Sequence, residues 1–269
     1  MTPARRPRAR AREHTSSRPP LVIAHRGDSS RCPENTLAAF ASAAAAGADG
    51  IELDVRLSSD GVVVVCHDAT LARFGGGVRA LGSRSCHELT HADVGSWFAP
   101  RYAHERIPTL AAVLKRFPRL VFIELKPPGG RGARVQARRL VAAVVQVVAR
   151  ARAAARVRLL CFSPGVLTEL RRLAPGLPRV RNLERAPVAP AAWLARQPGL
   201  QALCVDQRIL SAELAAAVRA RGLALYAYSC NTSAQLAAAR PHRLTALLTD
   251  RPAWLVARLG RGRRTGAGQ

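Results

Sequence analysis

Lysine and acidic residues are both scarce in this strongly basic chain of 269 residues. Lysine and arginine together number 42, against 17 aspartates and glutamates, and the formal net charge is +25. Only Lys115 and Lys126 are lysines, so the other 40 basic residues are arginines. We attribute this skew to a genome-wide composition bias, because alanine is over-used in the same chain. The charge is of the kind that attracts nucleic acid or anionic lipid, and that interpretation stays open here.

Long apolar runs and paired cysteines are absent. No run approaches the roughly 20 residues that a membrane-spanning helix needs, and no signal-peptide apolar segment follows the Arg-rich start. We therefore expect a soluble, cytoplasmic protein without a transmembrane segment. The six scattered cysteines form no CxxC pair, which argues against a structural zinc site or a disulfide scaffold and favours packing roles.

The two ends of the chain lack apolar periodicity. Arginines cluster in residues 1–19 and recur in the Gly-rich segment 261–269. Such composition is typical of disorder, so we expect a disordered basic tail at 1–19 and a flexible C-terminal tail at 261–269. The folded domain is expected at residues 20–260, a normal size for an α/β barrel.

Short β-rich runs alternate regularly with helical stretches along the chain. The strands are expected at residues 21–25, 50–55, 120–126, 157–163, 179–183, 202–206, 224–229 and 246–250. The helices are expected at residues 35–46, 109–117, 134–153, 164–173, 190–197, 211–222, 232–239 and 252–259. Eight such β-then-α units predict an α/β fold of the (β/α)8 TIM barrel type.

One further apolar run, VVVVC at residues 62–66, makes a ninth strand. It follows the strand at 50–55 too closely for a parallel crossover, which needs a dozen or more residues. We therefore expect a small antiparallel hairpin extension after the second strand. Asp60-Gly61 is a strong two-residue turn signal, and that turn sets Asp54 opposite His67. A slip of one residue changes the face to which His67 points.

Acidic side chains gather at the ends of the second and third barrel strands. The active site of such a barrel lies at the carboxyl ends of its strands, and residues two apart on a strand share a face. Glu52 and Asp54 are therefore expected to converge with Glu124. Like charges this close resist joint ionisation unless a cation neutralises them, and an all-oxygen set suits Mg²⁺ or Ca²⁺. A solvated edge strand is the ordinary alternative for an isolated ExD, but helices cover the outside of a closed barrel.

Two histidines and two cations lie at the same expected rim. A lone histidine is more often structural, but His25 and His67 stand beside an acidic cluster and suit general acid–base catalysis. Arg26 and Lys126 suit phosphate oxygens. Glu34 lies on the loop after the first strand, at the same rim. Capping of the following helix is assigned to Asn35 or Thr36, and the other histidines are interpreted as surface residues.

A series of motifs resembles the glycerophosphodiester phosphodiesterases. These motifs are AHRGDSSRCPENTLAAF, GADGIELDVRLSSDGVVVVCHDATLAR, IPTLAAVL, FIELK, AYSCN and LLTDRP. They extend from about residue 22 to residue 252, and their order is jointly very specific. The resemblance implies a (β/α)8 barrel that hydrolyses small glycerophosphodiesters to sn-glycerol 3-phosphate and an alcohol with a divalent cation, Ca²⁺ or Mg²⁺.

The resemblance also implies a role for each candidate residue. The metal ligands would be Glu52, Asp54 and Glu124. His25 would be the base, and His67 would be the acid that protonates the leaving alkoxide. The phosphate would be held by Arg26 and Lys126, with Glu34 as a supporting residue. Attack by water and attack by the substrate's own 2-hydroxyl group, through a cyclic phosphate, both remain open.

This chain departs from the family pattern at two places. Where the family usually has a Trp in a W-T-V-N segment, this chain has Tyr228-Ser229-Cys230-Asn231. Tyr228 keeps an aromatic platform over the glycerol or headgroup, but it differs in size and adds a hydroxyl group. In the segment after His67, Arg73 matches the family's Arg-Thr-Thr pattern and Phe74 does not.

Two alternative functions are kept beside the hydrolase. One is a phosphodiesterase of the lysophospholipase D type, which would need a long apolar groove at the barrel mouth. The other is a basic, non-catalytic barrel that binds nucleic acid or a membrane surface, in which the acids would not converge. Seven of the 17 acids fall within residues 28–68, which argues against nucleic acid as a partner. The oligomeric state is left open.

Overall fold

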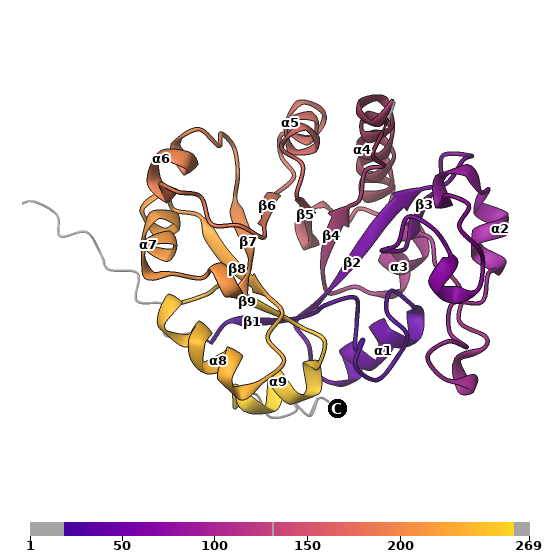
Figure 1. Cartoon of the computed structure of the whole chain (residues 1–269), viewed down its shortest axis with the longest axis horizontal. Coiled ribbons are helices and arrows are strands. Elements are labelled where there is room, and N and C mark those ends of the chain that lie inside the picture. The colour runs from indigo at the N-terminus through magenta and orange to yellow at the C-terminus, as the bar shows by residue number, and fades with distance from the viewer. Residues whose placement is uncertain (1–18, 131, 261–269) are drawn as a thin grey trace, which may run out of the picture.

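The computed structural model describes residues 19–130 and 132–260. The predicted tails, 1–19 and 261–269, lie outside the described residues apart from Pro19. Within the described part, eight parallel strands close into a ring surrounded by helices (Figure 1), and this confirms the predicted (β/α)8 barrel. The ring closes because β1 pairs with β2 on one side and with β9 on the other.

The element bounds lie close to the predicted ranges. The ring strands are β1 (Leu21–Ala24), β2 (Gly50–Leu57), β4 (Leu120–Leu125), β5 (Val157–Cys161), β6 (Arg179–Leu183), β7 (Ala202–Asp206), β8 (Ala224–Tyr228) and β9 (Ala246–Thr249). The helices are α1 (Leu37–Ala45), α2 (Cys86–His91), α3 (Leu110–Arg116), α4 (Ala133–Arg150), α5 (Pro164–Leu173), α6 (Pro190–Ala195), α7 (Ala212–Ala220), α8 (Ser233–Ala239) and α9 (Pro252–Arg258).

Alternation along each strand divides the core into two layers. Outward side chains such as Ile51, Leu53 and Val55 are fully buried between the ring and its helices. Inward side chains such as Ile23 and Phe122 fill the barrel itself. Polar residues on the inward face have no solvent beside them until the strand reaches the carboxyl end of the barrel, so they gather at that rim.

The strand β3 (Val63–Val65) lies outside the ring and pairs antiparallel with β2, as the sequence predicts. The predicted register is wrong by one residue. Val55 pairs with Val65, so Asp54 lies opposite Cys66 and not opposite His67. The backbone N–H of Cys66 donates to the carbonyl of Asp54 at 2.9 Å, which fixes this register.

The cause of the register error is the length of the turn. The N–H of Ser58 donates to the carbonyl of Val62 at 3.0 Å, so three residues form the loop and not the two that were assumed. Gly61 is the third of them and has a φ of 83°, in the left-handed region. A three-residue hairpin loop with glycine at its left-handed position is a common class, and it shifts the return strand by one.

The hairpin continues into an insertion at residues 66–109 that the sequence did not reveal. It holds α2 and short 3-10 turns, and it lies beside β2 outside the ring (Figure 1). A separate small core holds it together, formed by Val64, Cys66, Leu71, Leu81, Leu89, Val94 and Ile107. The apolar runs in this segment are too short to predict these elements, because the buried side chains stand singly and scattered along the sequence.

Candidate active site

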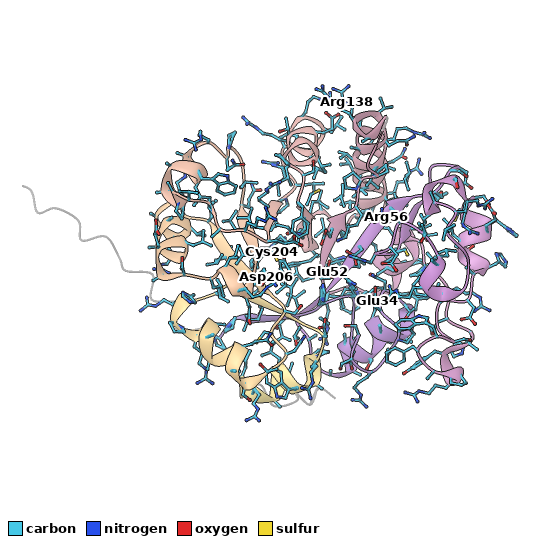
Figure 2. All side chains as sticks on the ribbon, viewed as in Figure 1. Glu34, Glu52, Arg56, Arg138, Cys204 and Asp206 are labelled. Atoms are coloured by element: carbon cyan, nitrogen blue, oxygen red, sulfur yellow. The ribbon has the colours of Figure 1, made fainter. Side chains whose placement is uncertain are left out.

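Three carboxylates meet at the carboxyl end of the barrel, as predicted. Glu52 and Asp54 come from β2, and Glu124 comes from the neighbouring strand β4, where it pairs in register with Asp54. One ligand oxygen from each of the three lies within 4.8 Å of the others, and all three residues are buried. Figure 2 shows Glu52 near the middle of the ring. The side chains therefore point into one small space.

The electrostatics of this cluster call for a cation. Burial and the charge of Asp54 raise the pKa of Glu52. Burial also acts to raise the pKa of Asp54, but Lys126 and Arg26 overcome it and hold that pKa below its usual range. Three carboxylates this close resist joint ionisation unless further positive charge balances them.

Two oxygens of the cluster also have spare acceptor capacity. The Lys126 ammonium lies 3.2 Å from Oδ1 of Asp54 and 2.5 Å from Oε1 of Glu124. Neither oxygen accepts an aligned hydrogen bond, although both are buried. A hard divalent cation prefers such an all-oxygen donor set. The three carboxylates thus fit a divalent metal.

Asn35 fixes the orientation of Asp54. Its amide Nδ2 donates to Oδ2 of Asp54 at 2.9 Å, and its Oδ1 accepts from the backbone N–H of Asp54 at 3.2 Å. The helix cap is Thr36, whose hydroxyl oxygen accepts from the N–H of Ala39 at 3.2 Å. The sequence left the cap open between Asn35 and Thr36, and the structure gives Asn35 a site role that this pattern did not indicate.

His25 stands at the end of β1 and is held by Asp250, which follows β9. Its Nδ1 lies 2.7 Å from Oδ1 of Asp250, and its Nε2 lies 4.0 Å from Oε2 of Glu52. Asn231 donates to the other oxygen of Asp250 at 2.5 Å, and Ser29 donates to the first at 3.2 Å. The histidine ring therefore has one nitrogen fixed and the other facing the carboxylates.

His67 forms a second pair, with Asp68. The Nδ1 of His67 lies 2.8 Å from Oδ1 of Asp68, and Arg73 bridges Asp68 at 2.8 Å and Glu34 at 2.7 Å. Arg56 donates from Nε and NH2 to the carbonyl of His67 at 2.9 and 2.7 Å. His67 lies beyond the end of β3, so these bonds set its position and not strand alternation. The sequence analysis did not single out Arg56.

The pKa directions of the two histidines are opposite. Burial acts to lower the pKa of His25, but the bond with Asp250 and the charge of Glu52 outweigh it and raise that pKa. Burial lowers the pKa of His67, and the charge of Arg26 adds to this effect against the opposing charge of Asp54. Both rings are bonded to an aspartate, so we attribute the opposite pKa directions to their other charged neighbours.

Arg26 lies between the acids on a sharply turned backbone. Its φ of 56° is left-handed, and Gly27 follows at 85°. A Cβ on Gly27 would approach Ala39 to 2.6 Å, so glycine is required there. The Arg26 guanidinium lies 3.1 Å from Glu34 and 3.2 Å from Asp54. Both predicted phosphate-binding cations, Arg26 and Lys126, are thus beside the carboxylates.

Tyr228 ends β8 at the same end of the ring but does not contact the carboxylates directly. Its ring lies edge-on to Phe162 with centroids 6.4 Å apart, and the Lys126 ammonium lies 5.7 Å from the Phe162 centroid. The Tyr228 hydroxyl donates to the carbonyl of Leu183 at 3.2 Å. Phe162, which the sequence analysis did not single out, therefore links the predicted platform to the site.

The convergence of the acids is contrary to what the non-catalytic, nucleic-acid or membrane-binding barrel required. Across the described residues, no helix combines the length and apolar character needed to cross a membrane. The described cysteines are all free, five of them buried, in agreement with packing roles.

Solved structures resemble this chain over most of its length. An Oleispira antarctica phosphodiesterase, solved with its product sn-glycerol 3-phosphate, has a TM-score of 0.82 and 28% identity, covering 90% of this chain and 97% of that one. A glycerophosphodiester phosphodiesterase from Agrobacterium tumefaciens has a TM-score of 0.75 and 28% identity, covering 88% and 99%.

Curated proteins named glycerophosphodiester phosphodiesterase are also similar to this chain. A glycerophosphodiester phosphodiesterase of Bacillus subtilis is 29% identical over 248 residues, which are 86% of this chain and 84% of that protein. One from Caldanaerobacter subterraneus is 50% identical over 95 residues, 35% of this chain. That alignment spans only 39% of the Caldanaerobacter protein. The alignment with a second relative from B. subtilis spans 44% of that relative.

A family model settles the relationship across the barrel. The glycerophosphoryl diester phosphodiesterase family matches residues 25–254, from the first candidate histidine to the start of the last helix. That family consists of enzymes, and its fold agrees with the ring of strands described above. The chain belongs to the glycerophosphoryl diester phosphodiesterase family.

Proposed function

We propose that this chain hydrolyses small glycerophosphodiesters to sn-glycerol 3-phosphate and an alcohol, using a divalent cation and two histidines. The observation that carries the proposal is the convergence of Glu52, Asp54 and Glu124 at the same rim as His25. Phosphodiester hydrolysis requires a base, an acid and positive charge at the phosphate. This rim brings groups of all three kinds together.

Each histidine has a distinct part in the proposal. His25 acts as the base toward the attacking hydroxyl or water, because Asp250 occupies its Nδ1 and leaves Nε2 beside Glu52. His67 donates a proton from Nε2 to the leaving alkoxide while Asp68 bonds its Nδ1. In both pairs the aspartate fixes the ring and its tautomer, as in the histidine pairs of other hydrolases.

The cations and carboxylates position the phosphate. Glu52, Asp54 and Glu124 would hold Ca²⁺ or Mg²⁺, which would supply Lewis-acid polarisation of a phosphate oxygen. Arg26 and Lys126 add hydrogen bonds to the other oxygens. Glu34 orients Arg26 through the ion pair at 3.1 Å.

The pKa directions of the two histidines agree with these roles once the charges of the divalent cation and of the anionic substrate are included. The charge of Glu52 contributes to the raised pKa of His25, so its neutralisation favours the unprotonated ring that a base needs. The charge of Arg26 contributes to the lowered pKa of His67. An anionic phosphodiester beside Arg26 offsets that charge and favours the protonated ring that an acid needs.

The test is release of sn-glycerol 3-phosphate from glycerophosphocholine, with and without EDTA. Glu52→Gln should abolish measurable turnover and weaken Ca²⁺ binding in a calorimetric titration. Glu213→Gln on α7 is the matched control, because Glu213 is exposed and makes no ion pair among the described residues. Full turnover in EDTA, or in Glu52→Gln, contradicts the proposal.

A further inference from the structure

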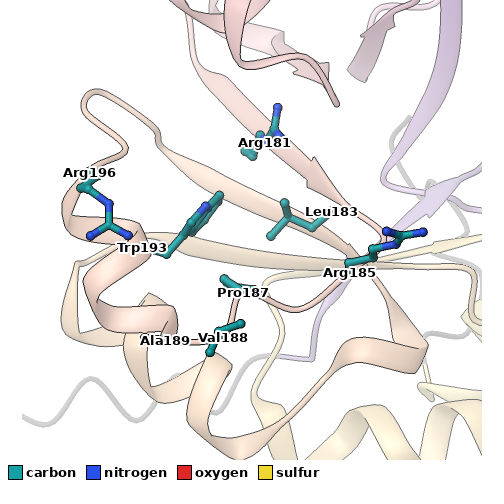
Figure 3. A pocket seen from close by; sticks show the side chains of 8 residues that line it. All are labelled: Arg181, Leu183, Arg185, Pro187, Val188, Ala189, Trp193 and Arg196. Carbon is teal, nitrogen blue, oxygen red and sulfur yellow. The ribbon is translucent and has the colours of Figure 1, made fainter.

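A buried asparagine, Asn182, lies near the end of β6 and is 3% exposed. Figure 3 shows its neighbours Arg181 and Leu183, which line a pocket between β6 and α6, outside the ring. Successive side chains on a strand point to opposite faces, and Val180, two residues before Asn182, belongs to the inner core. Asn182 therefore points into the barrel, near its carboxyl end.

The strand registers place Asn182 at the depth of the catalytic groups. Inward side chains from alternate strands form layers of four in such a barrel, and relative to the hydrogen-bonded pairs a layer advances by about one residue per strand. Counting from Asn182 through the pairs of β6 with β7 and of β7 with β8 gives Tyr228. Continuing around the ring gives His25 after β1 and Glu124 on β4. Asn182 thus lies in the layer of Glu124, across the ring from His25.

The strand beside Asn182 also lies near the carboxylates. Asn182 pairs in register with Cys204 on β7. Burial raises the pKa of the Cys204 thiol, and the charges of Glu52 and Glu124 add to this rise. Figure 2 shows Cys204 and Glu52 close together near the middle of the ring. The interior between Asn182 and the carboxylates is therefore narrow.

Aromatic side chains connect this part of the ring to a phosphate-binding cation. The Tyr228 hydroxyl donates to the carbonyl of Leu183, the residue after Asn182, at 3.2 Å. The Tyr228 ring lies edge-on to Phe162 with centroids 6.4 Å apart, and the Lys126 ammonium lies 5.7 Å from the Phe162 centroid. The part of the mouth formed by β5, β6 and β8 thus presents two aromatic rings and an amide.

The Asn182 amide lacks a partner that a buried amide usually has. Its Oδ1 is enclosed and accepts no hydrogen bond from residues 19–130 or 132–260, whereas the side-chain oxygens of Asn35 and Asn231 both accept from backbone N–H groups. The thiol of the adjacent Cys204 is at most a weak donor. A buried polar atom without a partner is costly. Rotation of the amide exchanges its oxygen and nitrogen, so Asn182 can accept from a ligand hydroxyl group or donate to it.

We propose that Asn182 binds the terminal hydroxyl group of the substrate's glycerol, and that Tyr228 and Phe162 contact its carbon chain. This inference rests on the proposed hydrolysis of glycerophosphodiesters. The leaving alcohol lies toward the insertion, because His67 protonates it there. The retained glycerol therefore lies within the ring, with its terminal hydroxyl group away from the phosphate and toward β6. A hydroxyl group both donates and accepts, as an amide does.

The test is a calorimetric titration of the full chain, in Ca²⁺, with sn-glycerol 3-phosphate and with 2-hydroxypropyl phosphate, which lacks only the terminal hydroxyl group. The wild type should bind the second ligand about tenfold more weakly, from the loss of one hydrogen bond in an enclosed site. Asn182→Ala should bind sn-glycerol 3-phosphate about tenfold more weakly than the wild type does. Its affinity for 2-hydroxypropyl phosphate should equal that of the wild type, which also shows that the site is intact.

Asn182→Leu should behave as Asn182→Ala does, which separates the lost amide from an added cavity. The matched control is Gln146→Leu, which removes an exposed amide from α4 and should leave both affinities unchanged. The proposal is overturned if Asn182→Ala changes both affinities by the same factor or changes neither, or if the wild type binds both ligands equally or binds neither. Binding needs no turnover. A chain that distinguishes the ligands but fails to hydrolyse glycerophosphocholine would therefore contradict the proposed reaction and support this site.

Discussion

The two histidine–aspartate pairs of this barrel are built in different ways. His25 and Asp250 are 225 residues apart, and they meet because β1 lies beside β9 in the closed ring. His67 and Asp68 are neighbours in sequence, carried by the insertion that follows the hairpin. The same bond is thus formed once by the topology of the whole barrel and once by a local segment.

This difference has consequences for rigidity. Asp250 is fixed by Asn231 and Ser29, which come from other strand ends of the ring. Asp68 is fixed by Arg73, whose guanidinium lies over Trp97 at 4.9 Å within the insertion. The barrel pair therefore depends on hydrogen bonds between packed strand ends, and the insertion pair depends on partly exposed ion pairs that salt can screen.

The largest expected effect comes from removing either ring. His25→Ala and His67→Ala should each lower kcat/KM on glycerophosphocholine by about 10²- to 10⁴-fold, the contribution of a positioned acid or base. Initial rates with Ca²⁺ present check this. His242→Ala is the control, because His242 lies in a short turn between α8 and β9 that has no buried residue. Full activity in either site variant would remove that histidine from the mechanism.

Next in size is the effect of the orienting aspartates. Asp250→Asn should lower kcat by about 10²-fold, because it disturbs the tautomer of His25 and the bonds of Asn231. Asp68→Asn should cost less, because Arg73 still holds the segment. Steady-state kinetics separate kcat from KM. Asp206→Asn at the end of β7, whose carboxylate pairs with Arg208, serves as the matched control. A greater loss in Asp68→Asn would reverse the order of rigidity.

A smaller effect is expected at Arg73. Arg73→Met should lower kcat/KM by up to about fivefold, because it removes half-exposed ion pairs to Asp68 and Glu34. The variant should also lose part of the salt dependence of the wild type, which rate measurements over a salt series report. Arg79→Met removes another ion pair of the insertion, with Glu88, and should leave both quantities unchanged. An unaltered salt dependence in Arg73→Met contradicts the ion-pair account.

The two rings should also respond to different ligands. Ca²⁺ should lower the raised pKa of His25 by neutralising Glu52, and it should also lower the pKa of His67 by neutralising Asp54. In contrast, sn-glycerol 3-phosphate should raise the lowered pKa of His67, because it offsets the charge of Arg26. NMR titration of the histidine ring protons measures both. If Ca²⁺ leaves the pKa of His25 unchanged, or if sn-glycerol 3-phosphate leaves the pKa of His67 unchanged, the assignment of these charged neighbours is wrong.

The smallest expected effect is on stability. In EDTA, the raised pKa of His25 contributes stability fully below the ordinary histidine value of about 6.5, and the contribution is lost as the pH rises through the folded-state pKa. Asp250→Asn removes part of that shift. The free energy of unfolding, measured in urea across this pH range, should therefore fall less steeply with pH in the variant. Parallel curves would mean that Asp250 does not raise the pKa.

The same contrast explains what the sequence reveals. Strand alternation places Glu52 and Asp54 on the inward face, and the barrel rule places both at the rim with Glu124, so the acidic cluster is predictable from local pattern. Asp250 is not predictable in this way, because only ring closure brings it to His25. The bond between Asn35 and Asp54 crosses 19 residues. The local pattern therefore indicated Asn35 only as a possible helix cap.

The hairpin marks the limit of local rules. Asp60-Gly61 identifies a turn, but two-residue and three-residue loops share that signal, and the structure has the longer one. The residue opposite Asp54 is therefore Cys66 and not the predicted His67. His67 still reaches the site because Arg56 binds its carbonyl, a contact that no sequence period encodes.

The most direct test of the separate roles is to vary the leaving group. The choline of glycerophosphocholine needs a proton on departure, whereas p-nitrophenolate from glycerophospho-p-nitrophenol does not. With the p-nitrophenyl ester, His67→Ala should recover to within about tenfold of the wild type, while His25→Ala should stay as depressed as with glycerophosphocholine. Recovery of His25→Ala, or equal behaviour of the two variants, would contradict the assignment of His25 as base and His67 as acid.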